Sequence, residues 1–282
     1  MKLVIGTAQF GAVYGAFNAC GQISLAEVEN ILARGCAAGI RVLDTARAYG
    51  VSETVLAQAG APSRFSIVTK CPALGSATDP AAAVAAAFEA SCAALGVSDI
   101  YGYLLHNSQD LMRPGVWSVL EALMRDGRVA RVGVSGYEVA EVAILCTHYP
   151  INLVQLPGNV LDPWFLQSPL PDGVDLHVRS AFLQGFLLAD PERLPARFQP
   201  WREILVAFRT NAAAHGLTPI QAALAPLLTC PRITQVVVGV DSLNQLGEIL
   251  DAAIVAETHQ NLSLAPLPNV SKSLTDPRRW KG

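Results

Sequence analysis

The chain has 282 residues, 51% of them hydrophobic and 15% charged, which fits one large α/β domain or two small ones. A net charge of −3 at pH 7 argues against a nucleic-acid-binding protein, because such proteins usually carry a basic excess. The six cysteines show no metal-ligand spacing and the apolar N-terminal segment is too short for a secretory signal or a membrane span, so we expect free thiols, no metal site and a cytoplasmic protein.

Short apolar and β-branched segments alternate with helical patterns along the whole chain. Ser24 with Glu27 forms a capping-box pattern that begins one helix, which Gly39 ends. Asp79 followed by Pro80 begins another. The expected helices include residues 24–38, 80–96, 114–126 and 242–255. The expected strands are residues 3–7, 40–44, 65–70, 100–105, 130–135, 152–156, 174–180 and 233–238.

Eight strand–helix units in about 250 residues predict a (β/α)8 TIM barrel. Strand segments such as VQL and VVVG lack alternation, which is typical of parallel strands covered on both faces. The alternative is a doubly wound open sheet, which usually has a GxGxxG turn after its first strand, whereas this chain has GTAQFG. We expect a single domain over residues 1–282, with the segment from about 260 to 282 on the barrel surface.

Four reactive side chains stand at or just after the ends of successive predicted strands: Asp44, Tyr49, Lys70 and His106. Because strand carboxyl ends open on one face of a barrel, these residues can meet there. An ammonium beside a phenol lowers the phenol's pKa, and an imidazole can bond to a substrate oxygen. The set predicts proton transfer to a carbonyl group. Taken singly, each residue could also have a structural role, such as a helix cap, a packed ring or a solvated charge.

The residues around this set resemble the aldo-keto reductases. DTARAYG is similar to that family's DTAxxYG motif. Five later segments resemble the family in the same order, and they are FSIVTK, YLLHN, LMRDGRVARVGVSG, RSAFLQGFLL and VVVGVDSLNQLGEIL. The resemblance covers roughly residues 3–255. It implies a barrel enzyme that reduces an aldehyde, ketone or sugar by hydride transfer from NAD(H) or NADP(H). Tyr49 would be the general acid, Asp44 and Lys70 would tune it, and His106 would orient the carbonyl.

The resemblance also implies a set of cofactor-binding residues. Ser135 and Gln155 would hold the nicotinamide carboxamide, and Ser180 with the backbone from Ala181 to Gly185 would bind the pyrophosphate. The full set is Thr7, Asp44, Ser135, Gln155, Arg179, Ser180, Ala181, Leu183, Gly185, Gly239, Asp241, Gln245 and Glu248. For the small-molecule carbonyl substrate, Phe10 and Tyr14 are expected to line the pocket, with Trp164 and Phe182 as further candidates.

The sequence departs from the family pattern at the cofactor site. Gly136 replaces a usual asparagine, and Arg179 stands where many members have a tyrosine that stacks on the nicotinamide; its planar guanidinium could stack instead. The segment 239–245 contains no cation for the 2′-phosphate of NADP(H). Asp241 would repel that phosphate but could accept a bond from a ribose hydroxyl. We therefore expect NAD(H) to bind at least as well as NADP(H).

Two other functions stay open. Some homologues in this family act as regulators in which bound cofactor signals redox state to a protein partner, and weakened nicotinamide positioning at Gly136 and Arg179 would suit such a sensor. A barrel hydrolase or isomerase would need a metal cluster or a second carboxylate facing Asp44, and the sequence suggests neither. We expect no nucleic-acid and no membrane partner.

Overall fold

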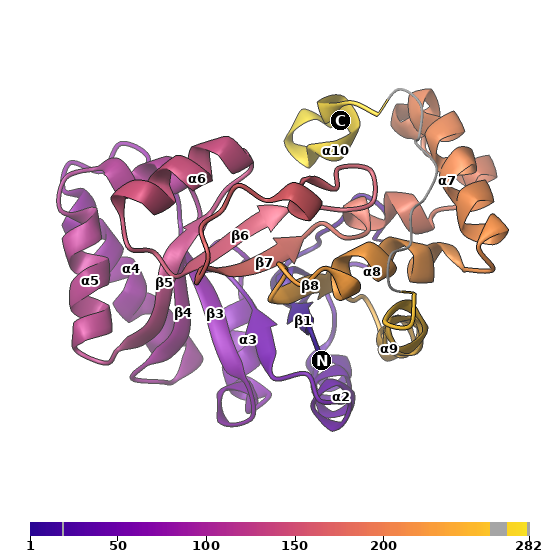
Figure 1. Ribbon diagram of the computed structural model, residues 1–282. Helices are drawn as coiled ribbons and strands as arrows, with labels where there is room; N and C mark the ends of the chain where they lie inside the picture. The colour runs from indigo at the N-terminus through magenta and orange to yellow at the C-terminus, as the bar shows by residue number, and fades with distance from the viewer. Residues whose placement is uncertain (19, 260–269, 281–282) are drawn as a thin grey trace.

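Eight parallel strands close into a barrel, so the predicted (β/α)8 architecture is confirmed (Figure 1). The computed structural model describes residues 1–18, 20–259 and 270–280. Each strand pairs with the next along the chain, and β8 pairs with β1. Every strand lies within two residues of its predicted bounds. The strands are β1 (Leu3–Gly6), β2 (Val42–Asp44), β3 (Ser66–Cys71), β4 (Ile100–Leu105), β5 (Val129–Ser135), β6 (Leu153–Pro157), β7 (Asp175–Arg179) and β8 (Gln235–Gly239).

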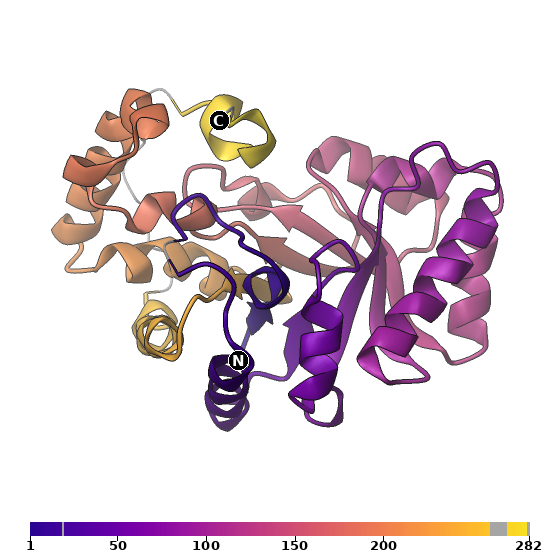
Figure 2. The ribbon, with the colours of Figure 1, turned by 180° about the vertical axis from the view of Figure 1, so that it is seen from behind.

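The helices lie around the outside of the barrel (Figure 2). Side chains at four N-caps accept a hydrogen bond from the first turn, as capping requires, and these residues are Ser24, Asp79, Thr218 and Ser242. The α-helices are α1 (Ala8–Gly11), α2 (Leu25–Ala37), α3 (Ser52–Gln58), α4 (Pro80–Leu95), α5 (Val116–Arg125), α6 (Val139–His148), α7 (Arg202–Ala214), α8 (Pro219–Thr229), α9 (Leu243–Ala256) and α10 (Lys272–Thr275). Short 3-10 helices cover Ala61–Ser63, Ser108–Met112, Trp164–Gln167, Leu183–Leu188, Pro191–Arg193, Ala196–Trp201 and Pro277–Arg279.

The predicted capping box at the start of α2 is half formed. Ser24 Oγ accepts from the backbone N–H of Glu27 at 3.3 Å. The Glu27 carboxylate does not return to Ser24 but accepts from the backbone N–H of Leu243 at 2.6 Å. Since α2 packs beside α9, this glutamate satisfies one of the free N–H groups at the start of α9 and links the two helices.

Two apolar clusters explain why the polar residues gather at one end of the barrel. The larger cluster fills the space between the sheet and the helices. The smaller one fills the barrel interior and consists of Val4, Val42, Val68, Leu104, Leu153 and Val237. Side chains repeat every two residues along a strand, so the next inward positions toward the carboxyl ends are Asp44 on β2, Lys70 on β3 and Gln155 on β6. Asp44, Lys70 and Gln155 therefore form a polar layer at the carboxyl ends of the strands, next to the smaller apolar cluster.

The C-terminal segment, residues 270–280, packs against the loops that follow β6 and β7. Lys272 pairs with Asp162 at 3.0 Å, and the Trp280 ring meets the Phe198 ring edge-on with centroids 5.0 Å apart. In Figures 1 and 2 the same segment, drawn in yellow, lies beside the ends of the outer helices. Residues 260–269 and 281–282 of the predicted surface tail lie outside the described residues.

Two expectations from composition can be compared with the structure. All six cysteines are free thiols. Within the described ranges, none of the helices is long and apolar enough to cross a membrane. A cytoplasmic location stays a prediction.

Candidate active site

Lys70 and Asp44 form a buried ion pair at the mouth of the barrel. The Lys70 ammonium donates to both carboxylate oxygens of Asp44, at 2.8 and 2.7 Å, and to the carbonyl oxygen of Thr45 at 2.8 Å. An ammonium has three N–H donors, so these bonds use all of them. Neither side chain is more than 4% exposed, so the pair is shielded from water and salt.

Tyr49 lies in the turn after β2, and two glycines bring this turn close to the first loop. A Cβ at Gly11 would overlap the carbonyl oxygen of Tyr49, and a Cβ at Gly50 would overlap the carbonyl oxygen of Gly11. Gly50 also has a φ of +59°, which disfavours other residues. The last glycine of DTARAYG is therefore needed to place the preceding tyrosine.

The structure brings all four predicted reactive residues together. The Tyr49 ring meets the His106 ring edge-on, with centroids 6.0 Å apart. The Lys70 ammonium lies 5.1 Å from the centre of the Tyr49 ring. Tyr14, one of the two expected substrate residues, lies with its ring 6.4 Å from that of Tyr49.

The charges around Tyr49 differ from the sequence expectation. Burial raises the pKa of Tyr49 above its ordinary value, and the Asp44 carboxylate adds to this increase. The Arg179 guanidinium opposes this increase and lowers the phenol pKa. Burial also lowers the pKa of Lys70, with Asp44 opposing it. Burial, with Lys70 and Arg179, lowers the pKa of His106 to about 4. At pH 7 Tyr49 is thus protonated and His106 neutral.

A cavity of about 680 Å³ opens from Tyr49 and Asp44 toward the start of α9. This volume is within the usual range for small-molecule sites. Tyr14 and Phe182 also line it. Its predicted cofactor residues are Thr7, Asp44, Arg179, Ser180, Ala181, Gly185, Gly239, Asp241 and Gln245.

Several predicted residues lie elsewhere. Ser135 and His106 line a second, smaller cavity of about 210 Å³. Phe10 and Leu183 are fully buried in the outer core and line neither cavity, because α1 and the turn after β7 direct them inward. The expectation for Phe10 as a substrate contact is therefore corrected. Glu248 and Trp164 also line neither cavity; Trp164 instead donates to the carbonyl oxygen of Pro157 at 2.7 Å.

The loop after β7 holds an unusual backbone along the cavity. Ser180, Leu183 and Gln184 have φ values of 64°, 49° and 52°. Positive φ costs free energy in residues other than glycine and is concentrated at functional sites. The Gln184 side chain accepts from the backbone N–H of Ala16 at 3.1 Å, which ties this loop to the loop after α1.

Comparison with known proteins agrees with this geometry. The model of the aldo/keto reductase family matches residues 2–263. The chain belongs to the aldo/keto reductase family. An aldo-keto reductase of Mycobacterium sp. (strain KMS) is 32% identical over 177 residues, which cover 58% of this chain and 62% of that protein. The chain thus matches less than two thirds of the length of this curated relative.

Two further comparisons extend the picture. The uncharacterized oxidoreductase YtbE of Bacillus subtilis (strain 168) is 28% identical over 110 residues, covering 38% of this chain and 39% of YtbE. The solved structure of the aldo-keto reductase AKR11C1 from Bacillus halodurans, in its holo form, superposes with a TM-score of 0.71. It is 19% identical and covers 94% of this chain and 93% of that one, so it supports the fold alone.

Gln155 is fully buried beside the Asp44–Lys70 pair and lines neither cavity. Its Nε2 donates to Asp44 Oδ1 at 2.6 Å, and its register partner across β5 and β6 is Ser135. Its Oε1 is buried and has no hydrogen-bond partner in the described part of the chain. Since a buried unpaired acceptor costs free energy, this oxygen suits an N–H donor from a ligand.

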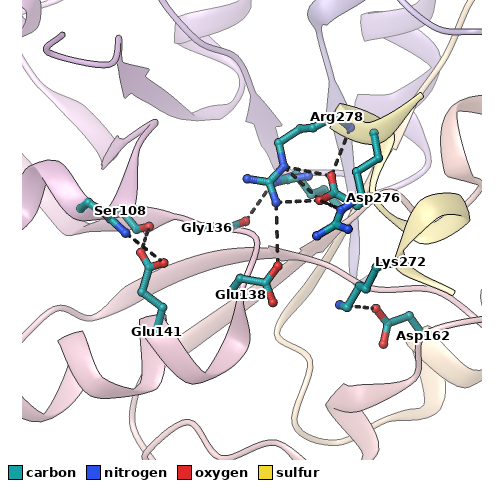
Figure 3. A network of polar contacts seen from close by, with 11 residues as sticks. Ser108, Gly136, Glu138, Glu141, Asp162, Lys272, Asp276 and Arg278 are labelled. Atoms are coloured by element: carbon teal, nitrogen blue, oxygen red, sulfur yellow. Dashed lines mark hydrogen bonds and ion pairs between the residues drawn. The ribbon is translucent and has the colours of Figure 1, made fainter. Parts of the chain in front are cut away.

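Gly136 and Arg179, the two residues that depart from the family pattern, are in direct contact. A Cβ at Gly136 would lie 2.5 Å from Val142 Cγ2, so the packing of α6 excludes the usual asparagine. The carbonyl oxygen of Gly136 accepts from Arg179 Nη2 at 2.8 Å. The Arg179 guanidinium lies over the Tyr137 ring, with its Cζ 4.2 Å from the centroid. Figure 3 shows Gly136 and the neighbouring charged side chains.

Asp241 presents an unpaired acceptor at the far end of the larger cavity. Its Oδ1 lacks a hydrogen-bond partner among the described residues, while its backbone N–H donates to the Gln245 side chain at 2.6 Å. Burial raises the pKa of Asp241, and a bond from Gln9 lowers it less. The segment 239–245 contains no lysine or arginine.

Sequence reasoning missed the residues that support the site. The Ser52 hydroxyl contacts the hydroxyls of Thr7 and Thr45 at 2.8 and 3.1 Å, which joins the first two loops. Tyr137 and Arg278 meet beside Gly136, with Arg278 Cζ 3.6 Å from the Tyr137 centroid. The only sequence signal for Ser52 was its place three residues after Tyr49, at the start of a helix.

Proposed function

We propose that this protein is a nicotinamide-dependent oxidoreductase that reduces an aldehyde, ketone or sugar to the alcohol. One observation carries the proposal: a phenol, an imidazole and a buried ammonium–carboxylate pair meet where a cavity of about 680 Å³ ends. Family membership supports it.

The proposed chemistry is proton donation to a carbonyl oxygen. When bound, the reduced nicotinamide supplies the hydride for the carbonyl carbon. Tyr49 gives its proton to the carbonyl oxygen, and water restores that proton afterwards. Its raised pKa keeps the phenol protonated before transfer, and Arg179 stabilises the phenolate that forms. His106 bonds to the same oxygen and fixes its direction.

Ser135 and Gln155 would hold the carboxamide, and the loop from Ser180 to Gly185 would bind the pyrophosphate. For the choice between cofactors, the unpaired Asp241 oxygen supports NAD(H) over NADP(H). An acidic group accepts a ribose hydroxyl and repels a 2′-phosphate. Titration with NADH and with NADPH is the test, and a clear NADPH preference at physiological salt would overturn this part.

The test of the proposed activity is NADH oxidation with a panel of neutral aldehydes, with the alcohol product identified. We expect Tyr49→Phe to lower kcat by about 10³-fold, the middle of the range for a general acid, while the Kd for NADH changes less than threefold. Tyr149→Phe, on the outer surface beside Trp117, is the matched control with unchanged kcat. Loss of NADH binding in Tyr49→Phe would indicate a structural role instead.

The alternative of a redox-sensing regulator stays a prediction. No contact in the described structure favours it. Turnover of the aldehyde panel at rates typical of reductases would make catalysis, rather than signalling alone, the function of the site.

A further inference from the structure

Arg179 places an unneutralised guanidinium at the mouth of the barrel. It ends β7, but its side chain reaches toward the end of β5, where Nη2 donates to the Gly136 carbonyl oxygen and Cζ lies over the Tyr137 ring. Over residues 1–18, 20–259 and 270–280, no carboxylate lies within ion-pairing distance of it. A guanidinium has five N–H donors, so donors remain for a ligand.

The neighbouring cations are different because each has its own acid. Lys70 is paired with Asp44. Arg278 is paired with Asp276 at 2.7 Å, and Glu138 lies 3.8 Å from it (Figure 3). Among these cations, Arg179 is the one that has no acid paired with it in the described part of the chain. Once a substrate excludes water from this half-buried site, the charge on Arg179 is costly unless an anion pairs with it.

The position of Arg179 indicates which ligand carries the anion. The phosphates of a dinucleotide are expected along the loop from Ser180 to Gly185, on the β7–β8 side of the mouth. Arg179 lines the larger cavity with Tyr49, but its Nη2 reaches across the mouth to the carbonyl oxygen of Gly136, a residue that lines the smaller cavity with His106. The anion thus belongs to the substrate.

The smaller cavity indicates what else the substrate contains. Its volume is about 210 Å³, and it adjoins His106 and Tyr137. Amide, hydroxyl and carboxylate groups line it, from Asn107, Ser108, Gln109, Glu138 and Glu141, together with the Arg278 guanidinium that is already paired with Asp276. Ser108 and Gln109 both reach Glu141, at 2.5 and 3.5 Å. Such a lining suits a short hydroxylated chain better than an apolar one.

We propose that the substrate is a hydroxylated carbonyl acid, that is, a sugar acid, whose carboxylate pairs with Arg179. This inference rests on the proposed function. The planar fork of a guanidinium matches the two oxygens of a carboxylate. The carbonyl oxygen then lies at Tyr49 and His106, and the hydroxylated chain extends into the smaller cavity.

The test compares matched substrates that differ in charge. With NADH, wild type should have a higher kcat/KM for D-glucuronate than for D-glucose. Arg179→Met should lower kcat/KM for both substrates, because Arg179 also stabilises the Tyr49 phenolate, but the loss for glucuronate should exceed the loss for glucose by about 10- to 100-fold, the value of a charge-assisted hydrogen bond; equal losses for the two substrates would contradict the proposal. Arg179→Lys, which keeps the charge and loses the fork, should fall between. Arg41→Met, at the amino end of β2, is the matched control.

A binding measurement separates this inference from the proposed activity. D-gluconate, a non-reactive acid, is titrated by calorimetry into the NADH-loaded protein, with sorbitol as the neutral match. Gluconate should bind and sorbitol should not, and Arg179→Met should weaken gluconate by at least tenfold. Equal gluconate affinity in wild type and Arg179→Met overturns the inference, whatever is turned over. Absence of turnover with every aldehyde overturns the proposed function instead.

Discussion

The two halves of the barrel mouth satisfy their polar groups differently. On the β2–β4 half, donors and acceptors are matched, and Lys70 gives all three of its bonds to Asp44 and Thr45. On the β6–β8 half, acceptors are left over, at Gln155 Oε1 and Asp241 Oδ1. Each unpaired buried acceptor costs about 1–3 kcal/mol, which ligand hydrogen bonds can recover.

The difference indicates how the site works. The proton-transfer half needs no ligand to hold its geometry, and such preorganisation is a main source of catalytic power. The other half has strained backbone at Ser180, Leu183 and Gln184 and completes its hydrogen bonds only with a ligand. Three experiments test this contrast, beginning with the largest expected effect.

The largest loss in the free energy of unfolding is expected from a substitution that breaks the Lys70–Asp44 pair on the β2–β4 half of the mouth. Lys70→Met leaves the Asp44 carboxylate buried without its cation, so the free energy of unfolding should fall by about 3–5 kcal/mol. Chemical denaturation measures it. Lys272→Met is the control, because its pair with Asp162 has a 48% exposed lysine and should contribute less than about 1 kcal/mol. Equal losses in both variants would show that the buried pair is not special.

His177, buried on β7 in the β6–β8 half of the barrel, should make the free energy of unfolding depend on pH. Burial lowers the pKa of His177 to about 4, whereas its unfolded value is near 6.5. The folded state therefore binds fewer protons between these values, and stability is lost as pH falls from about 6.5 to 4. The loss from His177 is about 3 kcal/mol at the acid end.

His177→Gln should flatten this slope by about half, because His106 has a similarly lowered pKa and keeps its own contribution. Denaturation midpoints at several pH values between 4 and 7 measure the slope. Parallel curves for wild type and variant would mean that His177 is protonated equally in both states.

The same contrast separates what the sequence could predict from what it could not. Asp44 and Lys70 were predictable because an apolar strand with period two fixes which residues face inward at its end. Tyr137 and Arg278 were not, since they meet across more than a hundred residues and no local pattern marks the contact. Gly136 was seen as a departure, but its cause, the packing of Val142, depends on where α6 lies.

The pKa of Tyr49 shows a second limit. The motif predicts an ammonium near the phenol, and Lys70 is indeed 5.1 Å from its ring centre. What the motif could not give is that the three N–H donors of this ammonium are already used by Asp44 and Thr45 and that Arg179, from β7, also lowers the pKa of the phenol. Side-chain partners are decided by three-dimensional competition, which spacing alone does not record.

The smallest expected effect comes from Asp241, whose carboxylate lies on the β6–β8 half of the mouth. Asp241→Asn removes the charge that would repel a 2′-phosphate and weakens the acceptor for a ribose hydroxyl. The ratio of Kd for NADPH to Kd for NADH should therefore fall about tenfold, corresponding to ~1.4 kcal/mol. Asp251→Asn, exposed on α9, the helix that follows Asp241, is the control. An unchanged ratio would assign cofactor choice to another part of the cavity, while a shift confined to Asp241→Asn would show that this half's unpaired acceptor exists for the ligand.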